Sequence, residues 1–335
     1  IAAEMNELTA AFYEARDEAG RFDLHRWGRE GITHLTPLWL LKFLPNMLAC
    51  HVTIIHDAQG PSNTITCSEA SAMLSIGESL RVIQRGTADA CFCGGAEDKL
   101  NPMSLLRQHF TGRLNTGSNE NPTAAVRPFD RKAAGTVVGQ GGAIVILESA
   151  ETFAKRREAA SGGEGGGDQS PAPRAYAEVL GFGASQTVHL PQKNLAPDPN
   201  GRGIALAIRA ALREAKIEPD AIDLIIPGGL GVPDYDQAEA AALFGIFGPR
   251  LKQVPIASCK PLVGSTFAGA GGIDVCMAAK AIAHQKVPAV INCDEPLSGL
   301  NAMTAPSRDA KIGHVLTYST SFGGQNAALV LKRID

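Results

Sequence analysis

The sequence predicts an α/β protein with a duplicated core, on the strength of three observations. Short β-branched segments typical of buried strands alternate along the chain with amphipathic helical segments. A helix–turn–strand unit occurs over 75–97 and again, at nearly the same length, over 271–292. Glycine is abundant, with 36 of 335 residues, while aromatic residues make up only 5%. This composition favours tight backbone turns between the strands and the helices.

Each element is expected where hydrophobic periodicity continues without a helix-breaking residue. Helices are expected over 1–20, 37–49, 70–84, 151–160, 203–216, 236–247 and 271–285. Strands are expected over 63–67, 88–94, 142–147, 175–183, 224–227, 255–258, 289–292, 314–319 and 327–332, and 51–56 is a further strand or strand-like edge.

A low-complexity segment divides this pattern into two halves. Residues 161–173 are rich in Gly, Ser and Pro and cannot form a core, so they predict a flexible surface loop. The predicted organisation is an N-terminal half over 1–160 and a C-terminal half over 174–335. Ligand sites in such sheets gather where strands end, which points to 67–71, 227–236, 258–266 and 320–325.

Composition excludes several classes of function. Thirty-one basic and 34 acidic residues give a formal charge of −3, which argues against a general nucleic-acid binder. No apolar run reaches the roughly 18–20 residues of a membrane helix, and no signal peptide is visible. The seven cysteines form no CxxC pair and predict reduced thiols in a cytoplasmic protein. No cofactor or metal is expected: 139–142 is a glycine turn before a strand, and the histidines lack ligand spacing.

A set of short motifs from about Leu35 onward resembles the β-ketoacyl-acyl-carrier-protein synthases of the thiolase superfamily. Each motif is weak alone, but their order and spacing together are specific. They are Leu44-Pro-Asn-Met47, Gly60-Pro-Ser62, Gly94-Gly-Ala-Glu97, Arg127-Pro-Phe-Asp-Arg131, Gly139-Gln-Gly141 and Ser321-Phe-Gly-Gly-Gln-Asn326.

The resemblance implies a thiolase-like duplicated fold in five αβαβα layers, and a two-fold dimer with the strand over 64–67 at its interface. The family begins with a strand–helix–strand segment before the equivalent of residue 1, so the first strands of the N-terminal half are missing from this sequence. We expect truncation rather than a fold without these strands, because their loss would expose sheet edges.

The same resemblance implies a Cys–His–His triad, and this chain lacks all three side chains. Counting from Gly60 and from Ile76 places Glu69 where the family has its nucleophilic cysteine. Gly228 and Ser265 stand at the two histidine positions. The family's lysine is kept as Lys260, its gating phenylalanine matches Phe322, and its Gly-Glu-Gly motif has become Gly139-Gln140-Gly141.

Three interpretations of Glu69 stay open from the sequence. Lys260 is the nearest cation on the family map, so Glu69 is expected to pair with it, directly or through water, and fill part of the former active site. Alternatively Glu69 only caps a helix, since a helix N-terminus favours an anion. The third interpretation is a catalytic carboxylate. Cys67 lies near the elbow but fits neither count, and a core position suits it better than that of a displaced nucleophile.

The leading functional hypothesis is a ketosynthase homologue of fatty acid or polyketide biosynthesis that does not condense. Such a pseudoenzyme would resemble a chain-length factor, which pairs with an intact ketosynthase and shapes its acyl cavity. The implied partners are acyl-carrier protein, an acyl chain and a second subunit, either identical or an intact ketosynthase. Alternatives are an acyltransferase, decarboxylase, hydrolase or cyclase that uses Glu69 or Ser265, and a carrier-protein or acyl-chain binding module without turnover. An open pocket at these residues would favour an enzyme, and a filled one a structural subunit.

Overall fold

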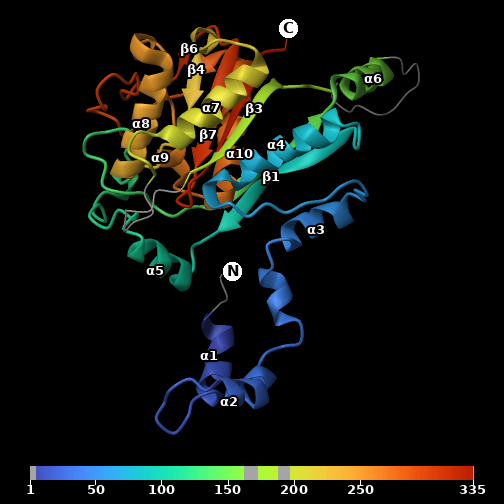
Figure 1. Ribbon diagram of the computed structural model, residues 1–335, viewed down its shortest axis with the longest axis vertical. Coiled ribbons are helices and arrows are strands. Elements are labelled where there is room, and N and C mark those ends of the chain that lie inside the picture. The colour runs from blue at the N-terminus through green and yellow to red at the C-terminus, as the bar shows by residue number, and fades with distance from the viewer. Residues whose placement is uncertain (1–4, 162–172, 188–196, 335) are drawn as a thin grey trace. The chain divides into compact units, whose positions relative to one another are not determined.

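A computed structural model of the chain describes residues 5–161, 173–187 and 197–334 (Figure 1). The chain forms two compact units: unit 1 contains residues 1–64 and 99–107, and unit 2 contains residues 65–98 and 108–335. The helices are α1 (Met5–Glu14), α2 (Leu24–Arg29), α3 (Met47–Ile55), α4 (Ser71–Gln84), α5 (Pro102–Phe110), α6 (Ala150–Ser161), α7 (Arg202–Ala215), α8 (Pro233–Phe247), α9 (Lys260–Val263) and α10 (Ala270–His284). The strands are β1 (Ala90–Asp98), β2 (Gln140–Glu148), β3 (Glu178–Gln186), β4 (Leu224–Ile226), β5 (Lys286–Val287), β6 (Arg308–Asp309), β7 (His314–Thr320) and β8 (Gln325–Lys332).

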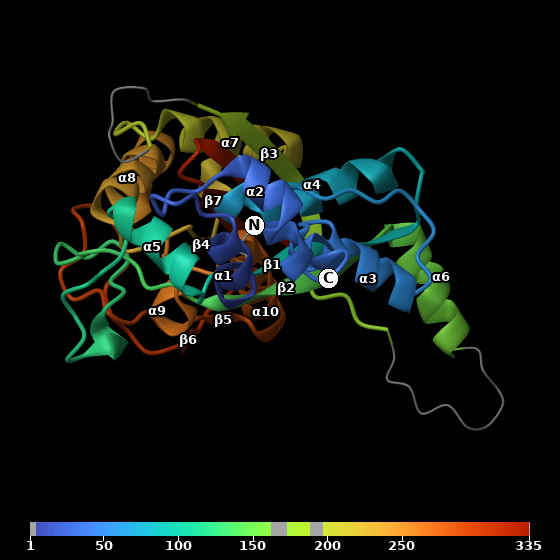
Figure 2. The same cartoon turned by 90° about the horizontal axis from the view of Figure 1, so that it is seen from below.

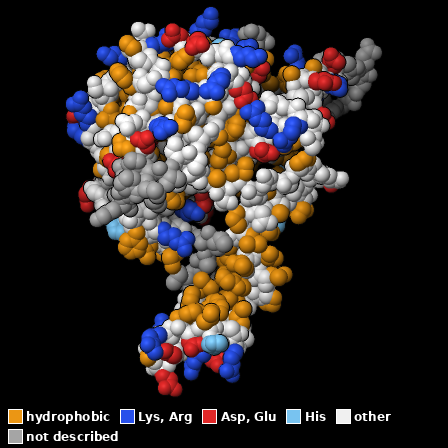
Figure 3. Space-filling model, in the orientation of Figure 1, with side chains coloured by type: hydrophobic (Ala, Val, Ile, Leu, Met, Phe, Trp, Pro, Cys, Tyr) orange, Lys and Arg blue, Asp and Glu red, His pale blue; other side chains and the backbone are white. Residues whose placement is uncertain are grey.

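Unit 1 is helical and has a small aromatic core. The rings of Phe12, Phe22 and Trp27 pack together with centroids 5.2–5.9 Å apart. By contrast, α3 has no buried residue although most of its side chains are apolar. Ile54 and Ile55 are both 74% exposed. Figure 3 shows many apolar side chains on the surface of this unit.

The core of unit 2 lies around a mixed four-stranded sheet in the order β3-β8-β7-β4. The β4–β7 pair is parallel, and the β3–β8 and β7–β8 pairs are antiparallel. Helix α7 packs on β3 and β8, and Figures 1 and 2 show α7 beside β3. The contact is close because Gly183 faces the helix: a Cβ there would lie 2.1 Å from the carbonyl oxygen of Ala207. Strands β7 and β8 are buried almost throughout, as expected for a sheet covered on both faces.

Helices α4 and α10 form the layer between this sheet and the antiparallel β1–β2 pair. Helix α4 packs against β1 and β8, and α10 against β2 and β7. The other face of the β1–β2 pair carries Phe92, Ile144 and Ile146, which are 41%, 44% and 67% exposed. Layers of helix, sheet, helix and sheet therefore follow one another in unit 2, and the described N-terminal half contributes only two strands to them.

Several predicted elements differ from the structure. The segment 51–56 lies in helix α3, so its prediction as a strand is wrong. Residues 63–67 are irregular rather than a strand, which removes the strand expected at the dimer interface. The strands predicted over 255–258 and 289–292 are reduced to isolated bridges, Ile225 with Ile256 and Val290 with Ala305. These runs are short, so tertiary context decided their conformation.

The predicted halves are a division of the sequence, and the compact units follow a different boundary. Ser161, the first residue of the predicted loop 161–173, ends α6. Residues 162–172 of that loop lie outside the described residues. The predicted boundaries at 160 and 174 stay a prediction.

Candidate functional site

The elbow at residue 69 is a short 3₁₀ turn, Ser68–Ala70, that leads directly into α4. Ser68 has a positive φ of 50°, a left-handed conformation that is uncommon outside glycine. The backbone N–H of Cys67 donates to the Ser71 hydroxyl over 2.8 Å and fixes the turn. The elbow packs against a second 3₁₀ turn, Phe267–Gly269, which precedes α10. Two 3₁₀ turns that each lead into a helix, one before α4 and one before α10, therefore meet here.

Glu69 is buried and pairs with Arg113. The Nη2 group of Arg113 donates to Oε1 of Glu69, and the two side chains are 2% and 3% exposed respectively. The predicted Glu69–Lys260 pair is wrong, and Glu69 does not cap α4 with its side chain. Burial opposes the charge of Arg113, but the charge of Glu69 outweighs burial and raises the arginine pKa.

Three aromatic rings surround the Arg113 guanidinium. Its central carbon lies 5.1 Å from the ring centroid of Tyr235, 5.4 Å from that of Phe322 and 5.9 Å from that of Phe267. Tyr235 and Phe267 are almost fully buried, whereas Phe322 is partly exposed. Cation–π attraction is strongest where the charge is desolvated, as it is here.

The pair is nevertheless under-satisfied. Within the described part of the chain, Oε2 of Glu69 and the Nε and Nη1 groups of Arg113 have no hydrogen-bond partner. Buried ion pairs contribute stability only when their remaining donors and acceptors are also satisfied.

Lys260 belongs to a separate buried pair. Its Nζ donates to both carboxylate oxygens of Asp274, each over 2.7 Å, and the Cys259 thiol donates to Oδ1 over 3.0 Å. Burial opposes the lysine charge, but Asp274 outweighs it and raises the Lys260 pKa. Burial also raises the pKa of Cys259 to about 12, so this cysteine is not a nucleophile at neutral pH. Lys260 and Asp274 therefore hold the start of α9 against α10.

Gly228 follows β4 and is buried beside Glu239 of α8. A Cβ at this position would lie 3.0 Å from Oε1 of Glu239, so a larger residue would crowd the carboxylate. Both carboxylate oxygens accept the backbone N–H of Gly229, over 3.1 and 3.2 Å. Burial raises the pKa of Glu239 to about 7. The site therefore holds a buried carboxyl group in a place where burial disfavours its charge.

Ser265 is fully buried, and its hydroxyl has no hydrogen-bond partner among the described residues. A serine nucleophile needs an adjacent base, so this geometry does not activate it. Phe322 lies in the Ser321–Gly324 turn between β7 and β8 and covers Arg113. Gln140 is exposed at the first position of β2 and so does not share the buried site.

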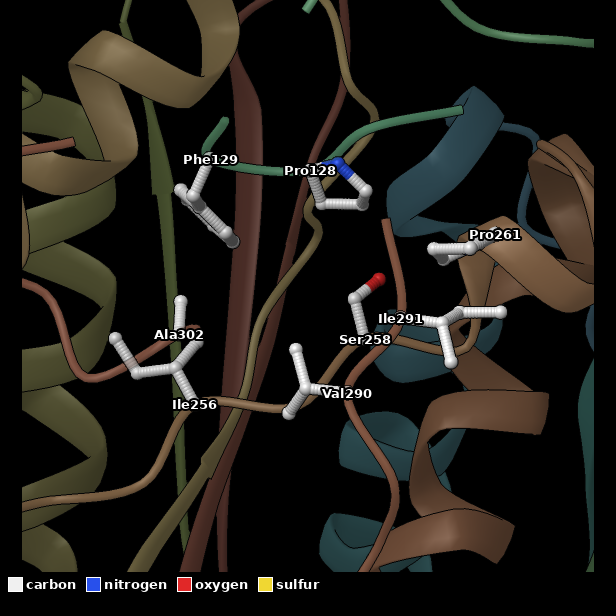
Figure 4. Close-up of a pocket in the computed structure, with 8 residues that line it drawn as sticks. All are labelled: Pro128, Phe129, Ile256, Ser258, Pro261, Val290, Ile291 and Ala302. Carbon is white, nitrogen blue, oxygen red and sulfur yellow. The ribbon is translucent and has the colours of Figure 1, made fainter. Parts of the chain in front are cut away.

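One small cavity lies among residues of the C-terminal half and the 128–129 segment (Figure 4). It measures about 10 Å³, enough for about one water molecule. Its lining residues are Pro128, Phe129, Ile256, Ser258, Pro261, Val290, Ile291 and Ala302. None of them is Glu69, Ser265 or Phe322. Glu69 and Ser265 are both buried, at 2% and 0% exposure.

Motif spacing predicted Glu69 and Ser265 as triad-equivalent positions, but it did not predict their surroundings. Arg113 lies in an irregular segment without a recognisable motif, so no sequence signal pointed to it. Asp236 and Glu239 could have been found, because two acidic residues three apart share the buried face of α8. Asp236 accepts the backbone N–H of Phe129 over 2.7 Å. It thereby ties the 127–131 motif to α8.

Two family models match the chain. The model described as beta-ketoacyl synthase, N-terminal domain, matches residues 13–152, and the one described as beta-ketoacyl synthase, C-terminal domain, matches residues 176–294. The 3-oxoacyl-[acyl-carrier-protein] synthase 2 of Coxiella burnetii is 31% identical over 91% of this chain and 69% of its own. The corresponding protein of Staphylococcus aureus is 29% identical over 91% of this chain and 70% of its own.

Solved structures of ketosynthases are similar to the chain as well. The ishigamide ketosynthase/chain length factor is 27% identical with a TM-score of 0.78, covering 90% of this chain and 68% of its own. A ketosynthase (ApeO) in complex with its chain length factor (ApeC) from Xenorhabdus doucetiae is 25% identical with a TM-score of 0.66, covering 85% and 63%. A third structure is a type II polyketide synthase acyl-carrier protein in complex with its ketosynthase. It is 22% identical with a TM-score of 0.82, covers 97% of this chain and 74% of its own, and has the same fold.

The chain therefore belongs to the β-ketoacyl synthase family and has its thiolase-like fold. The predicted family and fold are confirmed. It is a ketosynthase-like protein of the kind that serves fatty acid or polyketide synthesis. No helix among the described residues is both long and apolar enough to span a bilayer.

Proposed function

We propose that this chain is a non-condensing ketosynthase homologue that acts as a chain-length-factor-like subunit. One observation carries the proposal: the elbow that would present a nucleophile holds a buried carboxylate paired with Arg113. Condensation needs a thiolate that forms a thioester. A carboxylate at the same place would give an acid anhydride, which is too labile to hold a growing chain.

The side chains that would stabilise the carbanion formed from the malonyl unit are also replaced. Two donors are needed to stabilise negative charge on the malonyl thioester oxygen, and losing one such donor typically costs about 10²–10³ in rate. Gly228 offers no side chain, and Ser265 offers one buried neutral hydroxyl. Both replacements weigh against ordinary condensation.

A condensation assay tests the proposal. Purified chain is incubated with acyl- and malonyl-carrier protein, with the Coxiella burnetii relative as positive control, and 3-ketoacyl product is quantified. We expect no product above a blank without protein. Glu69→Cys alone is expected to stay inactive, because it restores the thiol without the two histidines. Turnover by the unaltered chain comparable to the control would overturn the proposal.

A partner subunit follows from the same proposal. Two of the similar structures are named as ketosynthases with a chain length factor, and α3 carries exposed apolar side chains that suit a protein interface. We expect this chain to form a stable complex with an intact ketosynthase encoded beside it, and to engage acyl-carrier protein through that complex. Co-expression followed by size-exclusion chromatography measures this. Ile54→Asp/Ile55→Asp should abolish the complex, with the exposed Ile334→Asp as control.

The alternative of altered acyl-thioester chemistry has less support. An enzyme that used Glu69 or Ser265 would need them to face an open pocket, and both are buried. The cavity in Figure 4 is lined by other residues.

A further inference from the structure

Two ion pairs among the described residues of unit 2, Glu69–Arg113 and Lys260–Asp274, are buried at both ends, and they differ in how completely they are satisfied. Lys260 and Asp274 share two hydrogen bonds, and Cys259 adds a third. Glu69 and Arg113 share one, and three of their polar atoms have no partner among the described residues. The Lys260–Asp274 pair is complete as a structural contact. The Glu69–Arg113 pair has fewer hydrogen bonds of its own and depends more on the aromatic rings around Arg113.

Those surroundings are asymmetric. Of the three rings around Arg113, Tyr235 and Phe267 are almost fully buried, and only Phe322 is partly exposed. Phe322 therefore separates the guanidinium from solvent. Its turn is short: the backbone N–H of Ser321 donates to the carbonyl of Gln325 and that of Gly324 to the carbonyl of Ser321, each over 2.9 Å.

We propose that Arg113 acts as a latch that holds the Phe322 ring and its turn against the buried ion pair, and that the charge of Glu69 keeps the latch in place. The Glu69 carboxylate neutralises Arg113 at its buried end, and Arg113 stays among the rings. Replacing that carboxylate by a neutral side chain would leave Arg113 as an uncompensated buried cation that must be hydrated. Water reaches it by displacing Phe322, because the other two rings are packed in the core. Arg113 is thus a positioning residue that couples residue 69 to the turn.

The latch rests on the proposed function and deepens it, since it gives the carboxylate at residue 69 a structural role in holding the Phe322 turn. Its test does not use condensation, so the two proposals fail separately. Hydrogen–deuterium exchange of the 321–325 amides is measured in the full chain. Glu69→Gln should accelerate exchange there by at least about tenfold, from the loss of a desolvated cation–π contact.

A matched control and a double-mutant cycle separate the latch from general loosening. Asp274→Asn breaks the other buried pair. Its acceleration of exchange at the 321–325 amides should stay within about twofold of its acceleration over the rest of unit 2. In a Phe322→Leu background, Glu69→Gln should no longer accelerate exchange. Equal acceleration with and without the Phe322 ring, equal acceleration by Asp274→Asn, or no acceleration by Glu69→Gln would each overturn the latch.

Discussion

The Glu69–Arg113 pair makes a sharp prediction about stability. Both side chains are almost fully buried, so replacing one by methionine leaves the other as an unpaired buried charge. Replacing both removes the charges and keeps a similar apolar volume. The single variants are Glu69→Met and Arg113→Met, and the third is the double variant.

The expected magnitudes follow from how the pair is satisfied. Removing one partner of a buried ion pair costs about 3–5 kcal/mol, whereas replacing both by apolar residues is neutral or stabilises by about 1–4 kcal/mol. Three atoms of this pair have no partner among the described residues, and an unsatisfied buried polar group costs about 1–3 kcal/mol. We therefore expect each single variant to lose about 3–5 kcal/mol, and the double variant to be as stable as the unaltered chain or more so.

Urea unfolding followed by far-UV circular dichroism measures these free energies. Tryptophan fluorescence is unsuitable because Trp27 and Trp39 both lie in unit 1, whereas the pair lies in unit 2. The exposed pair Lys155–Glu151 is the control, and Lys155→Met should cause no measurable change. Additive losses, with a double variant less stable than either single one, would refute the reasoning.

Three further predictions concern packing, pH and thiol reactivity. Gly183→Ala should destabilise the chain by about 1–3 kcal/mol or more, because its Cβ would meet the Ala207 carbonyl at 2.1 Å; Gly245→Ala, where nothing lies within 4 Å, should stabilise it by about 0.4–1 kcal/mol in the same urea titration. Burial raises the folded-state pKa of Glu239 to about 7 from 4.5. Between these pH values the folded state binds a proton that the unfolded state has lost, so the stability of the fold decreases as pH rises from about 4.5 to about 7. Glu239→Gln should therefore gain stability relative to the unaltered chain between pH 5 and pH 8, by roughly 3 kcal/mol, and a gain that does not change with pH would contradict this. Cys259, with a pKa of about 12, should resist iodoacetamide at pH 8 in the folded chain and react once unfolded, as peptide mass spectrometry would show; rapid labelling before unfolding would count against its burial.

Local patterns predicted the long elements of unit 2 well. The helices expected over 70–84 and 203–216 are α4 and α7 within two residues at each end, because their apolar positions repeat with a helical period over many turns. The segments 51–56 and 63–67 were mispredicted because a short apolar run carries too little periodicity to distinguish a strand from a helix or an irregular segment.

The candidate site was predictable as a set of positions but not as a set of contacts. Motif spacing identified Glu69, Gly228 and Ser265, and the structure buries all three. It did not identify the partner of Glu69, since Lys260 is taken by Asp274, which lies one helix further along the chain. Arg113 reaches Glu69 from 44 residues away, and no local periodicity encodes a contact of that range.

The sequence by itself determined the family and the long elements of the α/β pattern, because these depend on residue identity, spacing and periodicity. The replacement of the three reactive side chains stays a prediction from motif spacing. Only the tertiary structure decided which charge neutralises the carboxylate at the elbow and which rings enclose that charge. Such choices depend on which distant segments the folded core brings within hydrogen-bonding distance in a medium where an unpaired charge is costly.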